Sequence, residues 1–305
     1  MTHIVLTGAA GRAGRVTLRH LLEHGYQVTA VDTQKIAPPA GEFSGKLVAT
    51  LQADLTDLGE TLEVMQGAEA VVHLANIPAP GLQAPHRTFV QNIGMNHSVF
   101  TAAVMHRLAR VVWASSETTL GLPFDVPPRY APIDEEHYPY PESSYALSKV
   151  LTETMAVQMA RQSGIPFVAL RFSNILGPAE YRRFPAEAWP DPQARRWNLW
   201  GYIDEQDAAE VCRLALTAPL TGASSFIIAA ADTVMPTPSA ELMAQVFPGV
   251  PIRDTLSTHE TLLSIGEARR RLGFDPQHSW RGTLTEDGQE RWTDRSAEPG
   301  YTALL

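Results

Sequence analysis

A glycine-rich turn directly after a short apolar run constrains the fold of this chain most strongly. The run H-I-V-L-T ends at Thr7, and T-G-A-A-G-R-A-G then places Gly8, Gly11 and Gly14 before a segment with helical leucine spacing. Glycines permit a tight turn that a pyrophosphate can approach closely, and a helix N-terminus offers free N–H groups to phosphate oxygens. The order strand, glycine turn, helix therefore predicts a dinucleotide site.

Strand-like and helix-like segments alternate along the chain after this turn. We expect strands over 3–7, 27–32, 47–53, 70–74, 111–115, 167–172 and 225–230, and helices over 16–22, 56–65, 89–108, 144–162 and 205–216. Such alternation predicts a parallel sheet with helices on both faces, and right-handed crossovers make it doubly wound. The expected fold class is therefore α/β, with a Rossmann-type doubly wound parallel sheet.

The alternation stops after Gly177-Pro178, where 178–203 is rich in Pro, Arg and Trp and has no clear period. We expect residues 1–177 with about 204–235 to form the dinucleotide-binding Rossmann domain. Residues 178–203 with about 236–305 are expected to form a small C-terminal substrate cap.

An acidic residue at the end of the second strand indicates the cofactor. Asp32 lies 18 residues after Gly14, where a carboxylate can accept hydrogen bonds from both adenosine-ribose hydroxyls and would repel a 2′-phosphate. NAD is therefore the expected cofactor. NADP stays open as the alternative, because Arg12 or Arg15 could meet a 2′-phosphate.

Further cofactor contacts are expected at the carboxyl ends of the strands, where ligands of open parallel sheets bind. Asp54 could bond the adenine amino group with Leu55 covering the ring, or it could cap the next helix with Leu55 in the core; both interpretations stay open. The residues expected around the cofactor from the turn and the strand ends are Gly8, Gly11, Arg12, Ala13, Gly14, Asp32, Asp54, Leu55, Leu74, Ala75 and Asn76.

Three polar residues are candidates for catalysis. Ser116 follows the strand V-V-W-A-S, and Tyr145 and Lys149 lie four residues apart in Y-A-L-S-K, so they share one helix face. A nearby ammonium and a positive nicotinamide would favour the tyrosine phenolate, which could then take a proton from a substrate hydroxyl. Ser116 would hydrogen-bond the same oxygen.

Several motifs together resemble the extended short-chain dehydrogenase/reductases of the NAD-dependent epimerase/dehydratase family. They are the glycine turn, the Ser115-Ser116 pair, Y-A-L-S-K, R-F-S-N-I-L-G-P, G-Y-I-D-E-Q-D-A and A-R-R-R-L-G-F-D-P, so the likeness spans residues 3 to about 281. The resemblance implies a Ser-Tyr-Lys mechanism in which Lys149 also bonds the nicotinamide ribose. It also implies that Ile175 packs near the nicotinamide and that Asn92 belongs to the cofactor site. The usual Asn-x-x-Gly-Thr reads Asn92-Ile-Gly-Met-Asn96 in this chain.

Substrate expectations rest on the segment after Gly177-Pro178. Only 23 residues separate Pro178 from Tyr202, which favours a small substrate. The Thr-Asp-Glu of dehydratases is replaced by Ser-Glu-Thr, so dehydration is not expected. A-S-S-E-T-T-L-G and G-P-A-E-Y-R-R-F resemble the uronate dehydrogenase branch, which implies that Arg182 holds a substrate carboxylate. Arg182 and its neighbours could equally form an ordinary solvated basic face.

We therefore expect an NAD-dependent oxidoreductase that transfers hydride from a hydroxyl of a sugar or sugar acid. Substrate contacts are expected from Ser116, Tyr145, Asn174 and Arg182. The alternative is a nucleotide-sugar epimerase with tightly bound NAD. A third hypothesis, a non-enzymatic dinucleotide sensor, would be expected to lack the catalytic residues that this chain keeps.

Composition restricts the partners and the location. A net charge of -9 argues against a nucleic-acid surface, and no apolar run is long enough to suggest a membrane span. One cysteine and no signal peptide predict a cytoplasmic protein. The ten histidines show no Cys/His clustering, so no metal is expected. By analogy with similar folds, the helices near 89–108 and 144–162 are expected to pair in a homodimer.

Overall fold

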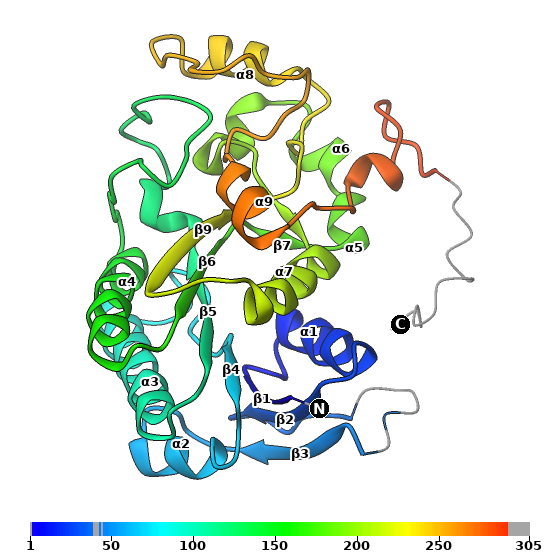
Figure 1. The fold of residues 1–305 in the computed structure, drawn as a ribbon. Helices are drawn as coiled ribbons and strands as arrows, with labels where there is room; N and C mark the ends of the chain where they lie inside the picture. The colour runs from blue at the N-terminus through cyan, green and yellow to red at the C-terminus, as the bar shows by residue number, and fades with distance from the viewer. Residues whose placement is uncertain (1, 39–42, 44, 292–305) are drawn as a thin grey trace.

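A seven-stranded parallel sheet forms the centre of the computed structural model, which describes residues 2–38, 43 and 45–291 (Figure 1). The strand order is β3-β2-β1-β4-β5-β6-β9. The strands are β1 (His3–Thr7), β2 (Gln27–Asp32), β3 (Leu47–Gln52), β4 (Ala70–His73), β5 (Arg110–Ser116), β6 (Phe167–Phe172) and β9 (Ala223–Ile228). Every strand predicted from the sequence is present, and the Rossmann-type fold is confirmed.

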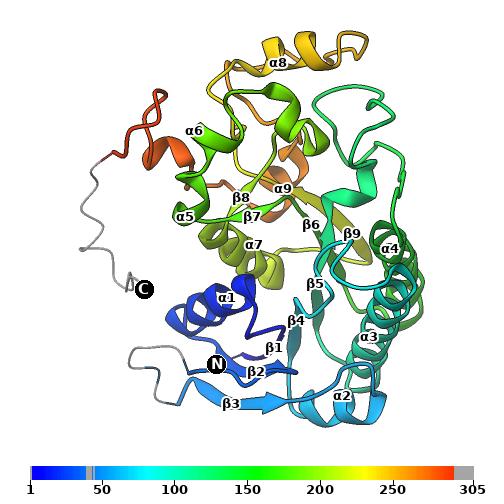
Figure 2. The ribbon, with the colours of Figure 1, turned by 180° about the vertical axis from the view of Figure 1, so that it is seen from behind.

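Helices cover both faces of this sheet (Figures 1 and 2). The helices α1 (Arg12–Glu23) and α7 (Glu205–Thr217) lie on one face, and α3 (Pro85–Met105) and α4 (Ser144–Ser163) lie on the other. The short α2 (Leu58–Val64) follows β3. Successive residues of a strand point to opposite faces, so Ile4 and Leu6 join the core under α1 and α7, whereas Val5 joins the core under α3 and α4.

Helix α3 is shifted from its predicted boundaries at both ends, since it begins at Pro85 rather than residue 89 and ends at Met105 rather than residue 108. Proline is favoured at the first position of a helix, because the N–H that it lacks would have no partner there. The residues directly after Pro85 are polar, so the hydrophobic pattern did not indicate that the helix begins there. Arg107 adopts a left-handed φ of 55°, which ends the helix early.

A second apolar core lies beyond the carboxyl end of the sheet. It combines Trp200, Tyr202, Met235 and Trp280 with Phe124, which lies between β5 and α4. Its elements are β7 (Ile175–Leu176), α5 (Pro178–Tyr181), α6 (Phe184–Glu187), α8 (Ser239–Val246) and the 3-10 turns η1 (Glu117–Leu120), η2 (Pro192–Asn198) and η3 (Trp280–Gly282). The buried apolar residues of β8 (Ile203–Asp204) and α9 (Gly266–Leu272) belong instead to the core under α1 and α7. The expected domain boundaries stay a prediction, and the end of the expected cap lies outside the described residues.

The strand order reverses at β1, which lies between β2 and β4. In doubly wound sheets the crevice beside this reversal is where ligands bind. The turn after β1 and the loop after β4 therefore open onto the same crevice.

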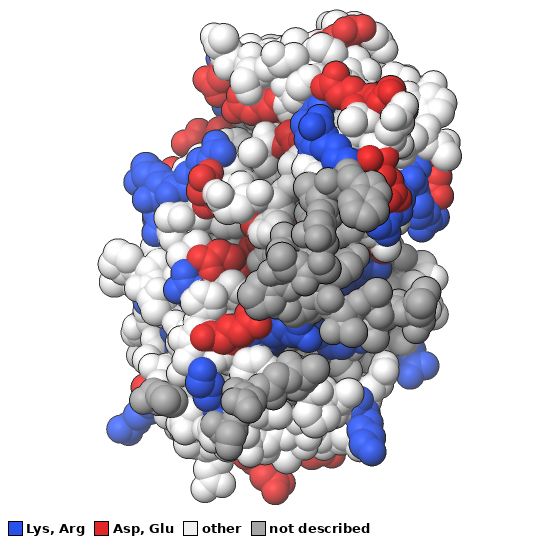
Figure 3. Space-filling view, turned by 90° about the vertical axis from the view of Figure 1, so that its right-hand side faces the viewer, with Lys and Arg blue, Asp and Glu red and all other residues white. Residues whose placement is uncertain are grey.

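Two surface properties bear on possible partners. Within the described part of the chain, no helix is both long and apolar enough to cross a lipid bilayer. On the face shown in Figure 3, Lys and Arg side chains are interspersed with Asp and Glu. The expectation that the protein binds no nucleic acid stays a prediction.

Candidate active site

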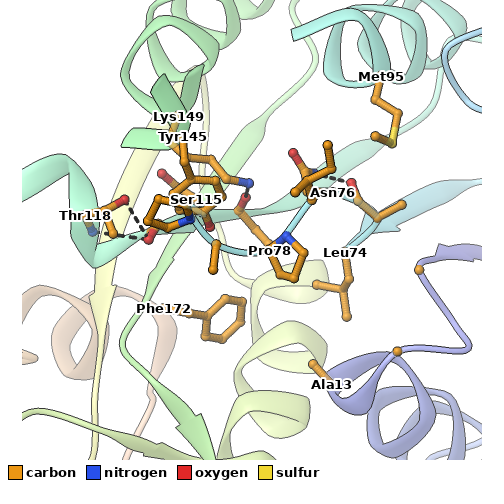
Figure 4. A pocket seen from close by; sticks show the side chains of 18 of the residues that line it. Ala13, Leu74, Asn76, Pro78, Met95, Ser115, Thr118, Tyr145, Lys149 and Phe172 are labelled. Atoms are coloured by element: carbon orange, nitrogen blue, oxygen red, sulfur yellow. Dashed lines mark hydrogen bonds between the residues drawn. The ribbon is translucent and has the colours of Figure 1, made fainter. Parts of the chain in front are cut away.

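A cavity of about 1050 Å³ opens along the carboxyl ends of the sheet strands (Figure 4). Its lining begins at the glycine turn, continues past the ends of β2, β3 and β4, and reaches the ends of β5 and β6 and the start of α4. It therefore follows the crevice at the strand-order reversal. Of the predicted site residues, all line this cavity except Asn92 and Arg182.

The glycine turn has room for backbone only. A Cβ on Gly14 would lie 2.0 Å from the Gly8 carbonyl oxygen, and a Cβ on Gly8 would lie 2.6 Å from the Ala75 nitrogen. Gly8 also has a positive φ of 71°, which glycine adopts without strain. Helix α1 begins directly after Gly11 without a side-chain cap, so its first N–H groups suit a pyrophosphate.

Asp32 is fixed at the end of β2 beside this turn. Its Oδ2 accepts a hydrogen bond from the Ala10 N–H at 3.0 Å, and its Oδ1 accepts one from the Gln34 N–H at 3.0 Å. Arg12 donates to Glu180 at 2.5 Å, and Arg15 donates to the Ala10 carbonyl at 2.7 Å. Both arginines that could have met a 2′-phosphate thus have partners, and the residues present fit NAD.

The two interpretations of Asp54 can now be separated. Asp57, not Asp54, caps α2 by accepting from the Glu60 N–H, so the helix-cap interpretation is wrong. Asp54 accepts from the Thr56 N–H at 2.9 Å and lines the cavity, where its role toward adenine stays a prediction. Leu55 lines the cavity and also belongs to the core.

A buried polar network supports the loop after β4. Asn92 holds this loop from behind, because its amide accepts from the Ile77 N–H at 2.9 Å and donates to the Ile77 carbonyl at 3.1 Å. His73 bonds Thr7 at 2.7 Å and Asn96 at 2.9 Å, and burial lowers its pKa to about 3. His73 is thus a fully buried core residue with a partner for each ring nitrogen.

The three predicted catalytic residues lie at one end of the cavity. Lys149 is almost fully buried, and its Nζ donates to the Ala114 carbonyl of β5 at 2.7 Å and lies 5.5 Å from the Tyr145 ring centre. The Ser116 hydroxyl accepts from the Thr118 hydroxyl at 3.0 Å. Figure 4 shows Tyr145 and Lys149 on the side of Ser115 and Thr118, across the cavity from Ala13 of the glycine turn.

Burial shifts both titratable groups of this set. Loss of hydration raises the pKa of Tyr145 to about 12, partly offset by a hydrogen bond with Ser116. The same effect lowers the pKa of Lys149 to about 7, partly offset by Glu153. Without a cofactor, burial therefore favours the neutral form of each side chain.

Glu117 is a cavity residue that the sequence did not single out. It is 4% exposed, and its carboxylate accepts from the Ser173 hydroxyl at 2.6 Å and from the Asn198 amide at 3.3 Å. Burial raises its pKa to about 7. These partners are 56 and 81 residues away in the sequence, so no local pattern could reveal the contact.

The cap contributes little to the lining. Arg182, the residue implied to hold a carboxylate, is half exposed, does not line the cavity, and donates from Nε to Glu290 at 2.7 Å. Beyond Ile175, Trp197 is the one described residue that lines the cavity. Asn174 and Ile175 line it at the end of β6 and the start of β7, as predicted.

Among the residues that the structure describes, one group of potential metal ligands lies away from the cavity. Ligand atoms of His20, His24 and Glu210 lie within 4.8 Å of one another between α1 and α7. The four-residue spacing of the histidines was a signal, but Glu210 is distant in the sequence. Arg213 holds both oxygens of Glu210 at 2.7 and 2.6 Å, which opposes a cation there.

Comparisons with known proteins show what this chain is similar to. The sequence model of the NAD dependent epimerase/dehydratase family matches residues 4–229. The UDP-glucose 4-epimerase of Corynebacterium glutamicum is 25% identical over 96% of this chain and 96% of its own length. The uronate dehydrogenase of Pseudomonas syringae pv. tomato is 27% identical over 72% of this chain and 71% of its own length. A solved mutated uronate dehydrogenase shares the fold, with a TM-score of 0.67, 21% identity and coverage of 92% of this chain and 83% of that chain.

Proposed function

The chain belongs to the NAD dependent epimerase/dehydratase family, and we propose that within it the protein is a dehydrogenase that oxidises a hydroxyl of a free sugar or sugar acid. Enzymes of this family use NAD, and the turn and the Asp32 carboxylate of this chain suit that cofactor. Its relatives include both a uronate dehydrogenase and a UDP-glucose 4-epimerase, so the family alone leaves two activities to be separated.

The lining of the cavity supports the dehydrogenase over the epimerase. A nucleotide-sugar needs a groove beyond the reacting sugar to hold its nucleotide. Among the described residues after Ile175, Trp197 alone lines the cavity, and the cap arginine Arg182 pairs with Glu290 outside it. A free sugar needs no such groove, and this is the observation that carries the proposal.

The roles that we propose for the catalytic residues follow from their positions. Tyr145 removes the proton of the substrate hydroxyl, and Ser116 donates a hydrogen bond to the same oxygen. Lys149, buried beside the Tyr145 ring, lowers the cost of the phenolate and bonds the nicotinamide ribose. NAD, when bound, supplies the hydride acceptor and a positive charge that further favours the phenolate.

A panel of sugars tests this function. Free aldoses, sugar acids and nucleotide sugars are each mixed with NAD or NADP, and NADH formation is followed by its near-ultraviolet absorbance. The proposal expects continuous NADH formation with at least one free sugar and NAD. Bound NAD in the purified protein, with interconversion of nucleotide sugars and no released NADH, would instead establish the epimerase. NAD binding without turnover of any sugar would indicate a dinucleotide sensor.

We also propose that the protein acts in the cytoplasm as a homodimer paired through α3 and α4. The exposed apolar side chains Val90 on α3 and Leu147, Leu151 and Val157 on α4 support the pairing, because burying them would remove apolar surface from water. The one cysteine, Cys212, is buried and unpaired, which suits a reducing compartment.

A further inference from the structure

The catalytic end of the cavity, meaning its lining residues within 114–149 and 172–197, carries an unusual charge distribution for a site that would bind an anion. Its described charged residues are Glu117, Glu142 and Lys149. Two of these three are carboxylates. A site for a carboxylate or phosphate normally presents a guanidinium or several free N–H donors instead.

Lys149 does not make up for this shortage of positive charge. Its Nζ is buried and donates to the Ala114 carbonyl, and its pKa is lowered by burial to about 7. Arg182, the cation that the resemblance offered for a sugar acid, pairs with Glu290 and does not line the cavity. The other cations among the described lining residues are Arg12 at the glycine turn and Arg87 on α3, both outside residues 114–149 and 172–197.

Glu117 is the carboxylate whose charge should matter most. It follows Ser116 directly, so it lies next to a proposed catalytic residue, and at 4% exposure it is poorly screened by water. Arg195 acts on it electrostatically from η2 but donates to the Gly201 carbonyl at 3.1 Å and does not line the cavity. Glu117 thus also offsets the charge of Arg195 at the substrate position.

We propose that the catalytic end of the cavity selects an uncharged sugar, an aldose in its ring form, and that the Glu117 carboxylate sets this preference by repelling the carboxylate of a sugar acid. The inference rests on the proposed dehydrogenase function and narrows its substrate class. A six-membered sugar ring is small enough that a carboxylate on its far carbon stays within the same end of the cavity. Specificity then comes from a repulsive element, as is common where related ligands share most contacts.

Two pairs of sugars that differ at one carbon test this preference. D-glucose is compared with D-glucuronate, and D-galactose with D-galacturonate, by kcat/KM for NADH formation at pH 8.5. In the pair that is turned over faster, we expect kcat/KM of the neutral sugar to exceed kcat/KM of its acid by about tenfold or more. Equal or better turnover of the acid would overturn the inference and leave the dehydrogenase standing. No NADH from any sugar would instead contradict the proposed function.

Replacing the Glu117 carboxylate by the isosteric amide tests whether Glu117 causes the preference for the neutral sugar. In Glu117→Gln we expect the ratio of neutral sugar to acid to fall by about fivefold or more, because Arg195 is then no longer offset. Asp125→Asn is the matched control, since it also removes one negative charge, from an exposed side chain beside Arg196 outside the cavity. An equal change of the ratio in Asp125→Asn, or none in Glu117→Gln, would overturn the role of Glu117.

The pH dependence of the same ratio gives a further readout. Glu117 accepts hydrogen bonds from Ser173 and Asn198, which do not titrate. The charged or titratable groups that act on Glu117 or share its end of the cavity are Arg195, Tyr145, Lys149 and Glu142. Because the pKa of Glu117 is about 7, the ratio of neutral sugar to acid should rise between pH 6 and 8.5. Loss of the Lys149 charge over the same range also disfavours the acid, so the profile is measured in Glu117→Gln as well, where the rise should be smaller and an equal rise would contradict the role of Glu117. A ratio that is flat or falls over this range would contradict the assignment.

Discussion

At the scale of single residues, burial acts on the two proposed catalytic groups in opposite directions. It raises the pKa of the Tyr145 hydroxyl to about 12 and lowers that of the Lys149 ammonium to about 7, so each group favours its neutral form. A phenolate at neutral pH therefore needs added positive charge beside the ring. This explains physically why the pair lies at the same cavity as a site that suits a nicotinamide cofactor.

A substitution at Asp32 should change the choice between the two cofactors. In Asp32→Asn the shape of the side chain is kept, so the bond to the Ala10 N–H can remain, but the charge that repels a 2′-phosphate is lost. We expect the ratio of kcat/KM for NAD over NADP to fall by about tenfold. The measurement is initial rates with each cofactor at a fixed sugar concentration. An unchanged ratio would show that Asp32 does not discriminate between the ribose 2′-hydroxyl of NAD and the 2′-phosphate of NADP.

Sequence reasoning at this scale succeeded where spacing was local and did not where partners were distant. The four-residue spacing of Tyr145 and Lys149 was sufficient to place both at the cavity, and the strand end was sufficient to place Ser116 there. Arg182 could not be placed, because its partner Glu290 is 108 residues away. The burial of Glu117 likewise depends on residues from β6 and η2.

At the scale of elements, the N-terminal strand, glycine turn and helix are the part of the fold that the sequence predicts most directly. The missing side chain of Gly8 allows the turn to lie against the residues after β4, and that of Gly14 allows α1 to pack against the turn itself. Alternation of strands and helices was readable because buried parallel strands are continuous apolar runs. The start of α3 was not readable, since a proline at the first helical position followed by polar residues has no hydrophobic period.

The helices α3 and α4 also carry a prediction about assembly. We expect a molar mass in solution of about twice the 33.4 kDa of one chain, measured by light scattering. Leu151→Glu on α4 should yield monomers, because a charge buried between helices without a partner is costly. Val48→Glu on β3 is the control, because that apolar side chain is similarly exposed, at 53% against 42%, but lies away from these helices. A wild-type monomer would contradict the pairing.

At the scale of the whole molecule, the sheet supplies the cofactor side of the cavity and the cap closes only a small part of it. The parallel sheet and its reversal at β1 could be predicted, because both follow from the order of the elements along the chain. The packing of the expected cap could not, since its core joins Phe124 with Trp200 and Trp280, and no periodic pattern links segments so far apart. Its small share of the lining is what favours a free sugar as substrate.

The central claim is that Tyr145 takes the substrate proton while NAD is reduced. The most direct measurement compares kcat for NADH formation by the wild-type protein and by Tyr145→Phe, with the best sugar of the panel. Removing the hydroxyl from a buried ring keeps its packing, so NAD affinity should change little, and kcat should fall by about 100-fold or more. Near-normal NADH formation by Tyr145→Phe, with NAD binding intact, would contradict the account.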